Sequence, residues 1–229
     1  MTEKNKNIYI SYWLFLTILL VAIMIFVGGL TRLTDSGLSI TEWGLLSGIY
    51  PPTNIKRWND VFALYKEIPE FKLLNHSMTL EMFKVIYLWE YIHRLLGRIV
   101  GLVYLLPLLL FTYKRMLNKL ELFKLYSIFF LISLQGFIGW YMVKSGLLEG
   151  TDVSHYRLSL HLTVAFIILI FLIWNFLIFY NYNLQGYVKK KIVPYNLPLL
   201  FILLVLLQIS LGALVSGLDG GKIYTTWPL

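Results

Sequence analysis

Five apolar stretches alternate with polar segments along this chain of 229 residues. A helix that crosses a membrane needs about 20 mainly apolar residues, and each stretch has roughly that length. The backbone of a span in lipid must satisfy its own hydrogen bonds, which favours helices over isolated strands. The pattern therefore predicts an all-α membrane protein with five transmembrane helices, at residues 8–30, 88–113, 125–143, 158–180 and 196–216.

The polar segments predict how these helices are oriented. Lysine and arginine dominate before the first helix, between the second and third, and between the fourth and fifth, whereas residues 31–87 balance them with acidic side chains. The positive-inside rule places the N-terminus in the cytoplasm, and the long loop at 31–87 and the C-terminus outside. The first apolar run lacks a small-residue cleavage site, so we interpret it as an uncleaved helix. The start of the chain has no transit-peptide composition, which favours a bacterial inner membrane.

The loop at 31–87 is long, and loops of such length more often carry a function than serve as plain connectors. Three prolines punctuate it, and its aromatic residues are of the kind that lie at a membrane surface. A folded cap with a small core of its own is an equally good interpretation. The aromatic residues concerned are Trp43, Trp58, Phe62, Tyr65 and Phe71.

Composition supports the membrane assignment, since 58% of the residues are hydrophobic, 14% are charged and the mean hydropathy is +0.70. The net charge of +8 does not indicate nucleic-acid binding, because the basic residues lie in short segments at helix ends. The chain has no cysteine, which excludes disulfides, thiolate metal sites, iron–sulfur clusters and covalently attached c-type heme. Any metal would be held by histidine, methionine or oxygen ligands.

A weak internal repeat links the ends of the first and fifth helices. Aligning residues 28–45 with residues 212–229 gives seven identities in eighteen positions. We interpret the fifth helix as the first of a second, similar unit, a construction that many membrane folds use. The chain would then hold a four-helix half at 1–195 and the start of an incomplete second half at 196–229, and a genuine five-helix protein is the alternative. The identities pair Gly28, Leu30, Asp35, Gly37, Thr41, Trp43 and Leu45 with Gly212, Leu214, Asp219, Gly221, Thr225, Trp227 and Leu229.

Two histidines are the strongest candidates for a chemical site. Ionisable residues within a membrane span are costly and are functional candidates by default. His93 and His161 lie near the outer ends of two parallel predicted helices, at similar depth. Two imidazoles at one depth can bind a heme iron axially, whereas zinc would require three or four ligands. A hydrogen bond between helices is the simpler alternative for each histidine, and we expect His76 and His155 to lie at the surface.

Charged residues surround this pair. Arg157 lies four residues before His161, and Arg94 and Arg98 form a second pair at helical spacing, so all three are candidates for binding heme propionates. Glu90 lies three residues before His93, on the same helix face, where it could lie over the edge of a bound macrocycle as a catalytic carboxylate. A local ion pair between Glu90 and Arg94, or a favourable position near a helix N-terminus, is the alternative.

Several motifs and their order resemble the heme A synthase family. The resemblance covers nearly the whole chain, and the lack of cysteine is similar to the branch that includes alphaproteobacterial and mitochondrial members. The motifs are GGLTRLTDSGLSITEW after the first helix, EYIHRLLGR in the second, LQGFIGWYMVKSGL in the third, HYRLSLHL in the fourth and LGALVSGLDGGKIYTTWPL after the fifth.

The resemblance implies an eight-helix protein with two similar halves, each with a pair of heme-ligand histidines. It implies oxidation of the C8 methyl group of heme O to the formyl group of heme A. His93 and His161 would be the ligands of the half that binds the substrate, Glu90 would be catalytic, and a heme b would occupy the other half. Because this chain ends before a second histidine pair, we expect it to be an incomplete, poorly active form. The implied partners are heme O, membrane lipid, heme O synthase and oxidase assembly factors, and a homo-oligomer is left open.

Two other classes of protein share some of these features. A b-type membrane cytochrome that carries electrons from quinol would need the same histidine pair, but no carboxylate over the ring. A transporter or assembly scaffold without heme would fit the helix count equally well. Retention of the heme spectrum with loss of product in a Glu90→Ala variant would separate the enzyme from the electron carrier.

Overall fold

The computed structural model describes residues 3–42, 48–181 and 196–223, and within these ranges it contains helices and no strands. Its five long helices correspond to the five predicted membrane spans, and all five are long and apolar enough to cross a membrane. The prediction of an all-α membrane protein is therefore confirmed. The helices are α1 Glu3–Leu33, α2 Ile55–Lys66, α3 Pro69–Leu73, α4 Leu80–Tyr113, α5 Lys119–Glu149, α6 His155–Asn181, α7 Asn196–Gly217 and α8 Gly220–Ile223.

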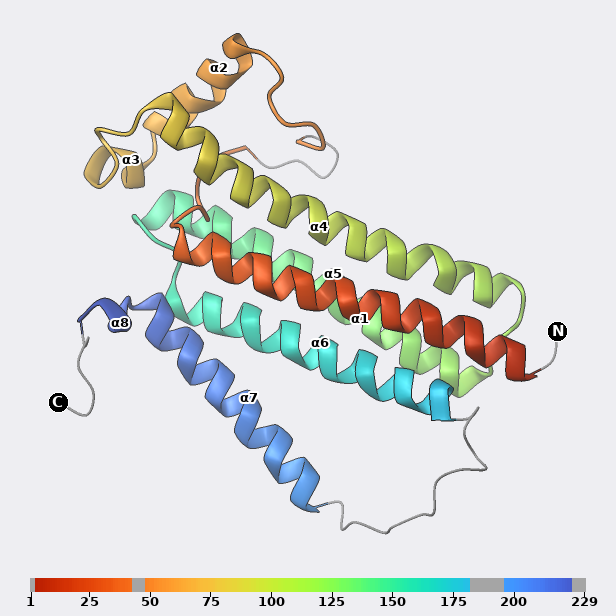
Figure 1. Ribbon diagram of the computed structural model, residues 1–229. Helices are drawn as coiled ribbons and strands as arrows, with labels where there is room; N and C mark the ends of the chain where they lie inside the picture. The colour runs from red at the N-terminus through yellow and green to blue at the C-terminus, as the bar shows by residue number, and fades with distance from the viewer. Residues whose placement is uncertain (1–2, 43–47, 182–195, 224–229) are drawn as a thin grey trace.

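Four of the long helices form a bundle (Figure 1). Helix α1 packs against α4 and α6, and α5 packs against the same two helices, whereas no close approach joins α1 to α5 or α4 to α6 within the described residues. The pairs α1/α5 and α4/α6 therefore lie across the two diagonals of the bundle. Helix α7 packs against the outside of α6, and α2 and α3 lie at one end of the bundle. We call the segment between α1 and α4, residues 34–79, the cap, and the neighbouring end of the bundle the cap end.

The helices extend beyond the stretches that hydropathy predicts. Helix α4 begins at Leu80 instead of residue 88, because Thr79 caps it by accepting a hydrogen bond from the backbone N–H of Met82 at 3.3 Å. Helix α5 begins at Lys119 instead of residue 125, behind a capping box in which Asn118 and Glu121 bind each other's backbone N–H. Hydropathy records the part of a helix that lies in lipid, whereas caps set its ends. The loop expected at 31–87 is correspondingly shorter.

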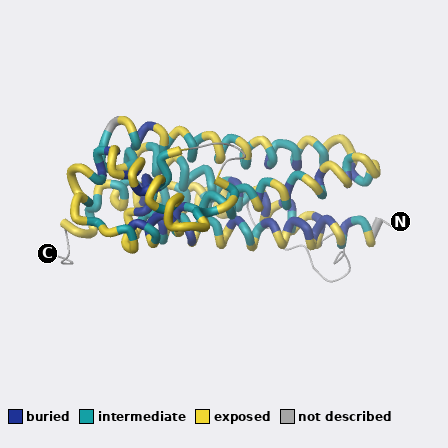
Figure 2. Tube along the Cα trace, turned by 90° about the horizontal axis from the view of Figure 1, so that it is seen from above, coloured by how far each residue is buried: buried dark blue, intermediate teal, exposed yellow. Residues whose placement is uncertain are grey.

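The end of the bundle away from the cap is filled by apolar side chains. All four bundle helices contribute residues to one buried cluster, and exposed residues recur along the same helices (Figure 2). Close packing of this kind holds membrane helices together, because lipid is as apolar as the side chains themselves. The members with no exposed surface are Ile10, Leu14, Tyr104, Leu108, Leu125 and Leu172.

A proline inside α4 is accommodated at this end. Pro107 has no backbone N–H, so it cannot donate to the carbonyl of Val103 one turn earlier. The indole N–H of Trp13 from α1 donates to that carbonyl instead, at 2.9 Å. In lipid an unpaired carbonyl is costly, and a side chain from a neighbouring helix removes that cost here.

The cap has a small core of its own. Phe62 and Tyr65 of α2 are buried against Phe83 of α4, with ring centroids 4.9 and 5.1 Å from that of Phe83. Phe71 of α3 packs edge-on against both α2 rings, and Trp58 lies edge-on against Tyr87, at 5.1 Å. Of the two interpretations of the aromatic loop, the structure favours a folded cap. Trp43 lies outside the described residues.

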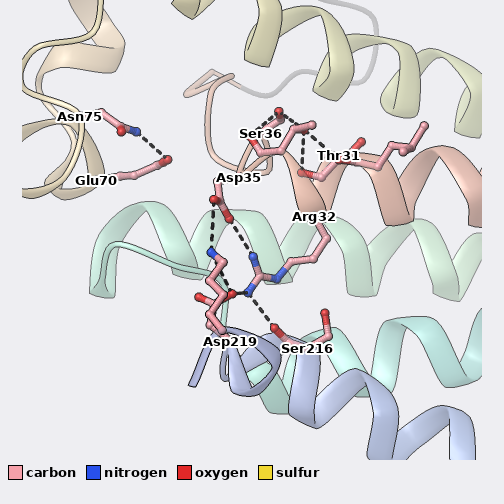
Figure 3. A network of polar contacts seen from close by, with 11 residues as sticks. Thr31, Arg32, Asp35, Ser36, Glu70, Asn75, Ser216 and Asp219 are labelled. Carbon is pink, nitrogen blue, oxygen red and sulfur yellow. Dashed lines mark hydrogen bonds and ion pairs between the residues drawn. The ribbon is translucent and has the colours of Figure 1, made fainter. Parts of the chain in front are cut away.

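Helices α1 and α7 end in the same way, as the repeat suggests. Asp35 and Asp219 both adopt a left-handed backbone, with φ of 47° and 52°, a conformation that aspartate tolerates better than most residues. Arg32 joins the two ends, because its guanidinium donates to Asp35 at 2.8 Å and to Asp219 at 2.9 Å (Figure 3). It also donates to the carbonyl of Ser216 at 2.8 Å. The aligned residues at 43–45 and 224–229 lie outside the described part of the chain.

Candidate functional site

The two candidate histidines lie on diagonal helices of the bundle. His93 comes from α4 and His161 from α6. In each imidazole, Nδ1 is buried and has no hydrogen-bond partner within the described structure. A neutral imidazole can bind a metal through either ring nitrogen. Two such rings on diagonal helices of one bundle are the kind of ligand pair that can bind a heme iron.

Both histidines lie near the cap end. His161 follows the first residue of α6 by six residues, or about 9 Å of helix. His93 lies against Gly28, which precedes the last residue of α1 by five residues, or about 7.5 Å. Because α1 ends and α6 begins at the cap end, the two imidazoles are at similar depth.

The level of the bundle that carries the histidines lacks the close apolar packing seen elsewhere. We call it the histidine layer, and it comprises residues 24–31, 90–98, 135–142 and 157–164. Val27 is the one buried hydrophobic residue in this layer, all of which is described. The layer separates the cluster of the bundle from that of the cap.

Glu90 is the most enclosed polar residue of the histidine layer, with 2% of its surface exposed. Ser39 donates to its Oε2 through the side-chain hydroxyl at 2.7 Å, and Ile40 through the backbone N–H at 2.8 Å. Arg94 forms an ion pair with Oε1. Neither Ser39 nor Ile40 stands out in the sequence. Both belong to the SIT segment after α1, which supplies one hydroxyl donor and one backbone N–H donor to Glu90. These contacts fasten the start of the cap to α4.

The three candidate arginines have different surroundings. Arg94 forms the local ion pair with Glu90 that the sequence left open as an alternative. It also donates to the carbonyl of Ile40 at 3.0 Å. Arg98 is half-buried one turn further along α4. The guanidinium of Arg157 lies over the ring of Tyr141, with its central carbon 4.9 Å from the centroid. Arg98 and Arg157 lie on α4 and α6, the helices that carry the histidines.

The other two histidines lie away from this layer. His76 is exposed in the cap, as expected. His155 is half-buried at the first residue of α6, and a Cβ added at Gly217 would come within 2.6 Å of its Cβ. We expected His155 at the surface, and its packing against the end of α7 is not visible from hydropathy. No group of three or more metal-binding side chains occurs among the described residues, which leaves the histidine pair as the candidate.

A second carboxyl group is buried in the cap. Glu70 is 4% exposed, and the amide nitrogen of Asn75 bridges its Oε1 and the hydroxyl of Tyr65, at 3.3 and 2.9 Å (Figure 3). Its Oε2 has no hydrogen-bond partner in the described structure. Burial raises the pKa of Glu70 to about 8, and the nearby charges of Asp152 and Glu90 act in the same direction. Near neutral pH this side chain is therefore mostly uncharged.

The fold and site together define a multi-pass membrane protein with two histidines held on diagonal helices of a four-helix bundle. The sequence profile described as cytochrome oxidase assembly protein matches residues 11–229. The chain belongs to the heme A synthase family. This confirms the resemblance found in the sequence.

Three relatives illustrate the match. The chain is 55% identical to heme A synthase of Pelagibacter ubique, and the alignment covers 98% of this chain and 66% of the relative. It is 45% identical to heme A synthase of Rickettsia bellii, with 98% and 67% covered. For heme A synthase of Maricaulis maris the identity is 46%, with 99% and 66% covered. The chain thus spans about two thirds of the length of these relatives. No solved structure matches it.

Proposed function

We propose that this chain acts in heme A biosynthesis, in the oxidation of the C8 methyl group of heme O to a formyl group. The family supports a role in making heme A, and the heme A synthases to which the chain is similar carry that activity in their names. The observation that carries the proposal for this chain is the histidine layer. It has two imidazoles on diagonal helices, each with a buried nitrogen that has no partner, and one enclosed carboxylate beside them.

In this proposal His93 and His161 would hold the heme iron, with heme O as the substrate bound between α4 and α6. A bound heme would supply a redox-active iron and a conjugated ring through which electrons can leave the methyl group. Arg98 and Arg157 bind its propionates, since arginine pairs with carboxylates through a bidentate fork.

Glu90 is the proposed catalytic residue. It lies one helical turn from His93, on the cap side, and two donors from the cap together with Arg94 hold the carboxylate in place. A carboxylate fixed in this way can accept a proton or stabilise a positive charge that develops on the substrate. In this view Arg94 orients Glu90 and leaves the propionates to the other two arginines.

We also propose an orientation in the membrane. Lys4, Lys6, Lys114 and Arg115 occur at the end of the bundle away from the cap, which the positive-inside rule assigns to the cytoplasm. The N-terminus is then cytoplasmic, and the histidine layer lies near the outer face of a bacterial inner membrane. Heme O synthase and oxidase assembly factors are the proposed protein partners, since one supplies the substrate and the others use the product.

The proposal is tested by expressing the chain in membranes that contain heme O and extracting the hemes. We expect formyl-bearing heme in the extract, and we expect a Glu90→Gln variant to retain the low-spin spectrum of a histidine pair while it loses product. Glu81→Gln is the matched control, because Glu81 is exposed on the same helix. Full product formation by Glu90→Gln would remove Glu90 from the mechanism. A purified wild-type chain with no Soret band would refute heme binding altogether.

A further inference from the structure

We propose that Gly28 of α1 and Gly139 of α5 are positioning residues for the two histidines. Each leaves a stretch of bare helix backbone against which one imidazole rests, and this contact sets the angle of the ring. The inference rests on the proposed heme ligation by His93 and His161, and it assigns to two glycines the task of orienting those ligands.

The contact at Gly28 is with the imidazole of His93. A Cβ added to Gly28 would lie 2.9 Å from Cε1 of His93, 3.4 Å from Nδ1 and 3.8 Å from Nε2, and these ring atoms are the three nearest to it. Real Cβ atoms essentially never approach another heavy atom to less than 3.0 Å. Any side chain at position 28 would therefore displace the ring of His93.

The contact at Gly139 repeats this geometry with the second histidine. An added Cβ would lie 2.9 Å from Cε1 of His161 and 3.6 Å from each ring nitrogen. The bundle order is α1, α4, α5, α6, so glycine and histidine alternate around it. Each imidazole reaches across to the preceding helix in this order, and the two contacts are equivalent. This arrangement fixes both ring planes through helices that carry no ligand.

Close approach to an imidazole is particular to these two glycines of the bundle. Small residues in membrane helices commonly serve helix packing alone. Three other bundle glycines have no atom within 4 Å of an added Cβ, namely Gly29 of α1, Gly101 of α4 and Gly136 of α5. A Cβ at Gly97 would meet the flexible end of Met24 at 3.3 Å. General helix packing therefore does not account for the contacts at Gly28 and Gly139.

A methyl group at either position should alter the ligand rather than the fold. The nearest atom is the far end of a side chain, so turning the imidazole relieves the overlap without moving backbone. Ligation of a metal by imidazole depends on the orientation of the ring, and groups that orient a metal ligand typically affect affinity by about 10- to 100-fold. Loss of ligand geometry in a folded protein is the expected signature.

The experiment compares Gly28→Ala and Gly139→Ala with the controls Gly29→Ala and Gly136→Ala in the full chain. Each protein is purified without heme and titrated with ferric heme, and its low-spin ferric signal is recorded by electron paramagnetic resonance. We expect Gly28→Ala and Gly139→Ala to bind heme about 10- to 100-fold more weakly and to shift the g values. The controls should match the wild type in both measurements.

The outcomes separate this inference from the proposed function. If the wild type shows the signal of a histidine pair but Gly28→Ala and Gly139→Ala match their controls, the positioning role is refuted and ligation stands. A wild type without that signal refutes both. If Gly28→Ala does not fold, the double variant Gly28→Ala/His93→Ala removes the ring from the overlap and should fold again. A double variant that stays unfolded would refute the contact.

Discussion

The two ends of the four-helix bundle are built on opposite principles. Away from the cap, residues from all four helices meet in a cluster whose central side chains are fully buried. In the histidine layer, by contrast, Val27 is the one buried hydrophobic residue. The other buried residues of the layer are polar, namely Thr31, Glu90 and Ser159, and the two histidines are half-buried. The end away from the cap is held together by contacts among its own side chains. The cap end holds the candidate histidines and charged side chains, and this difference marks the histidine layer as the candidate site.

Lipid gives the comparison its physical meaning. Membrane helices associate through side-chain packing, because they gain nothing from leaving water. A layer with a single buried apolar side chain contributes less to the association of the helices than the apolar cluster does. Local departures from the rules of stable packing are typical of functional sites. Four sets of variants test this difference between the two ends of the bundle and the parts attached to them.

The largest effect is expected at the proposed ligands. His93→Ala and His161→Ala would each remove one proposed ligand nitrogen, so neither variant should retain the low-spin spectrum of a histidine pair. Titration of the purified variants with ferric heme, followed by visible spectroscopy, measures this loss. His76→Ala is the control, since His76 is exposed in the cap. A histidine-pair spectrum in either variant would show that the histidine layer is not the site.

The second effect tests the packed end. Leu108→Ala removes a fully buried side chain of the apolar cluster, and we expect the free energy of unfolding to fall by about 2 kcal/mol or more. Leu106→Ala is the matched control, because Leu106 is 60% exposed on the same helix. Reversible unfolding in detergent measures both. Equal losses for the two variants would mean that the packed end is not a core, and neither should alter heme affinity.

The third effect is a pH dependence of the cap. Glu70 has a pKa of about 8 in the folded chain, against roughly 4.3 when unfolded. The folded state then binds more protons between these values, so the stability of the cap falls as pH rises from about 4.3 to 8 and levels off above. Opening of the cap should rise by up to about tenfold per pH unit in that window.

Limited proteolysis of the cap between pH 5 and pH 9 would measure this opening. Tyr65 and Asn75 are the polar groups next to Glu70, and a Glu70→Gln variant leaves both unchanged. It also leaves unchanged the charges that act on Glu70, which are those of Asp152, Glu90 and Asp35. The variant should lose the pH dependence. An equally steep profile in wild type and variant would assign the effect to another group.

The smallest effect is expected at the junction of α1 and α7. Arg32→Ala removes ion pairs with Asp35 and Asp219, and pairs that are partly exposed contribute at most about 1 kcal/mol. We expect a small decrease in the unfolding temperature, which should shrink further at high salt. Lys72→Ala, in an exposed pair with Glu67, is the control. A loss of several kcal/mol would show that this junction holds the bundle together.

The sequence predicted the helices more accurately than their ends. Hydropathy identified all five spans, because the thickness of the lipid sets the minimum length of an apolar run that can cross it. It missed the start of α4 at Leu80, because the first turns of that helix lie in the cap and pack against Phe62 and Tyr65. The ends depend on the capping residues Thr79 and Asn118, which hydropathy does not weigh.

The candidate site was predictable as a set of residues and not as a set of contacts. Ionisable side chains in a span stand out in the sequence, so His93, His161 and Glu90 could be singled out. Their partners could not, because Ser39 and Ile40 reach Glu90 from some 50 positions away in the chain. Gly28 was visible as part of the repeat, but its contact with an imidazole depends on how α1 and α4 pack.

Left-handed residues mark three helix ends, and they show how locally each end is specified. At the end of α1, Asp35 has a positive φ, and the N–H of Ser36 bonds back to the carbonyl of Thr31 at 3.0 Å. Arg115 ends α4 in the same manner, and Asp219 has the same backbone conformation after α7. The backbone bonds that close these turns join residues within about one turn of each helix end. The last turn of each helix can therefore specify where that helix stops, whichever helix is packed against it.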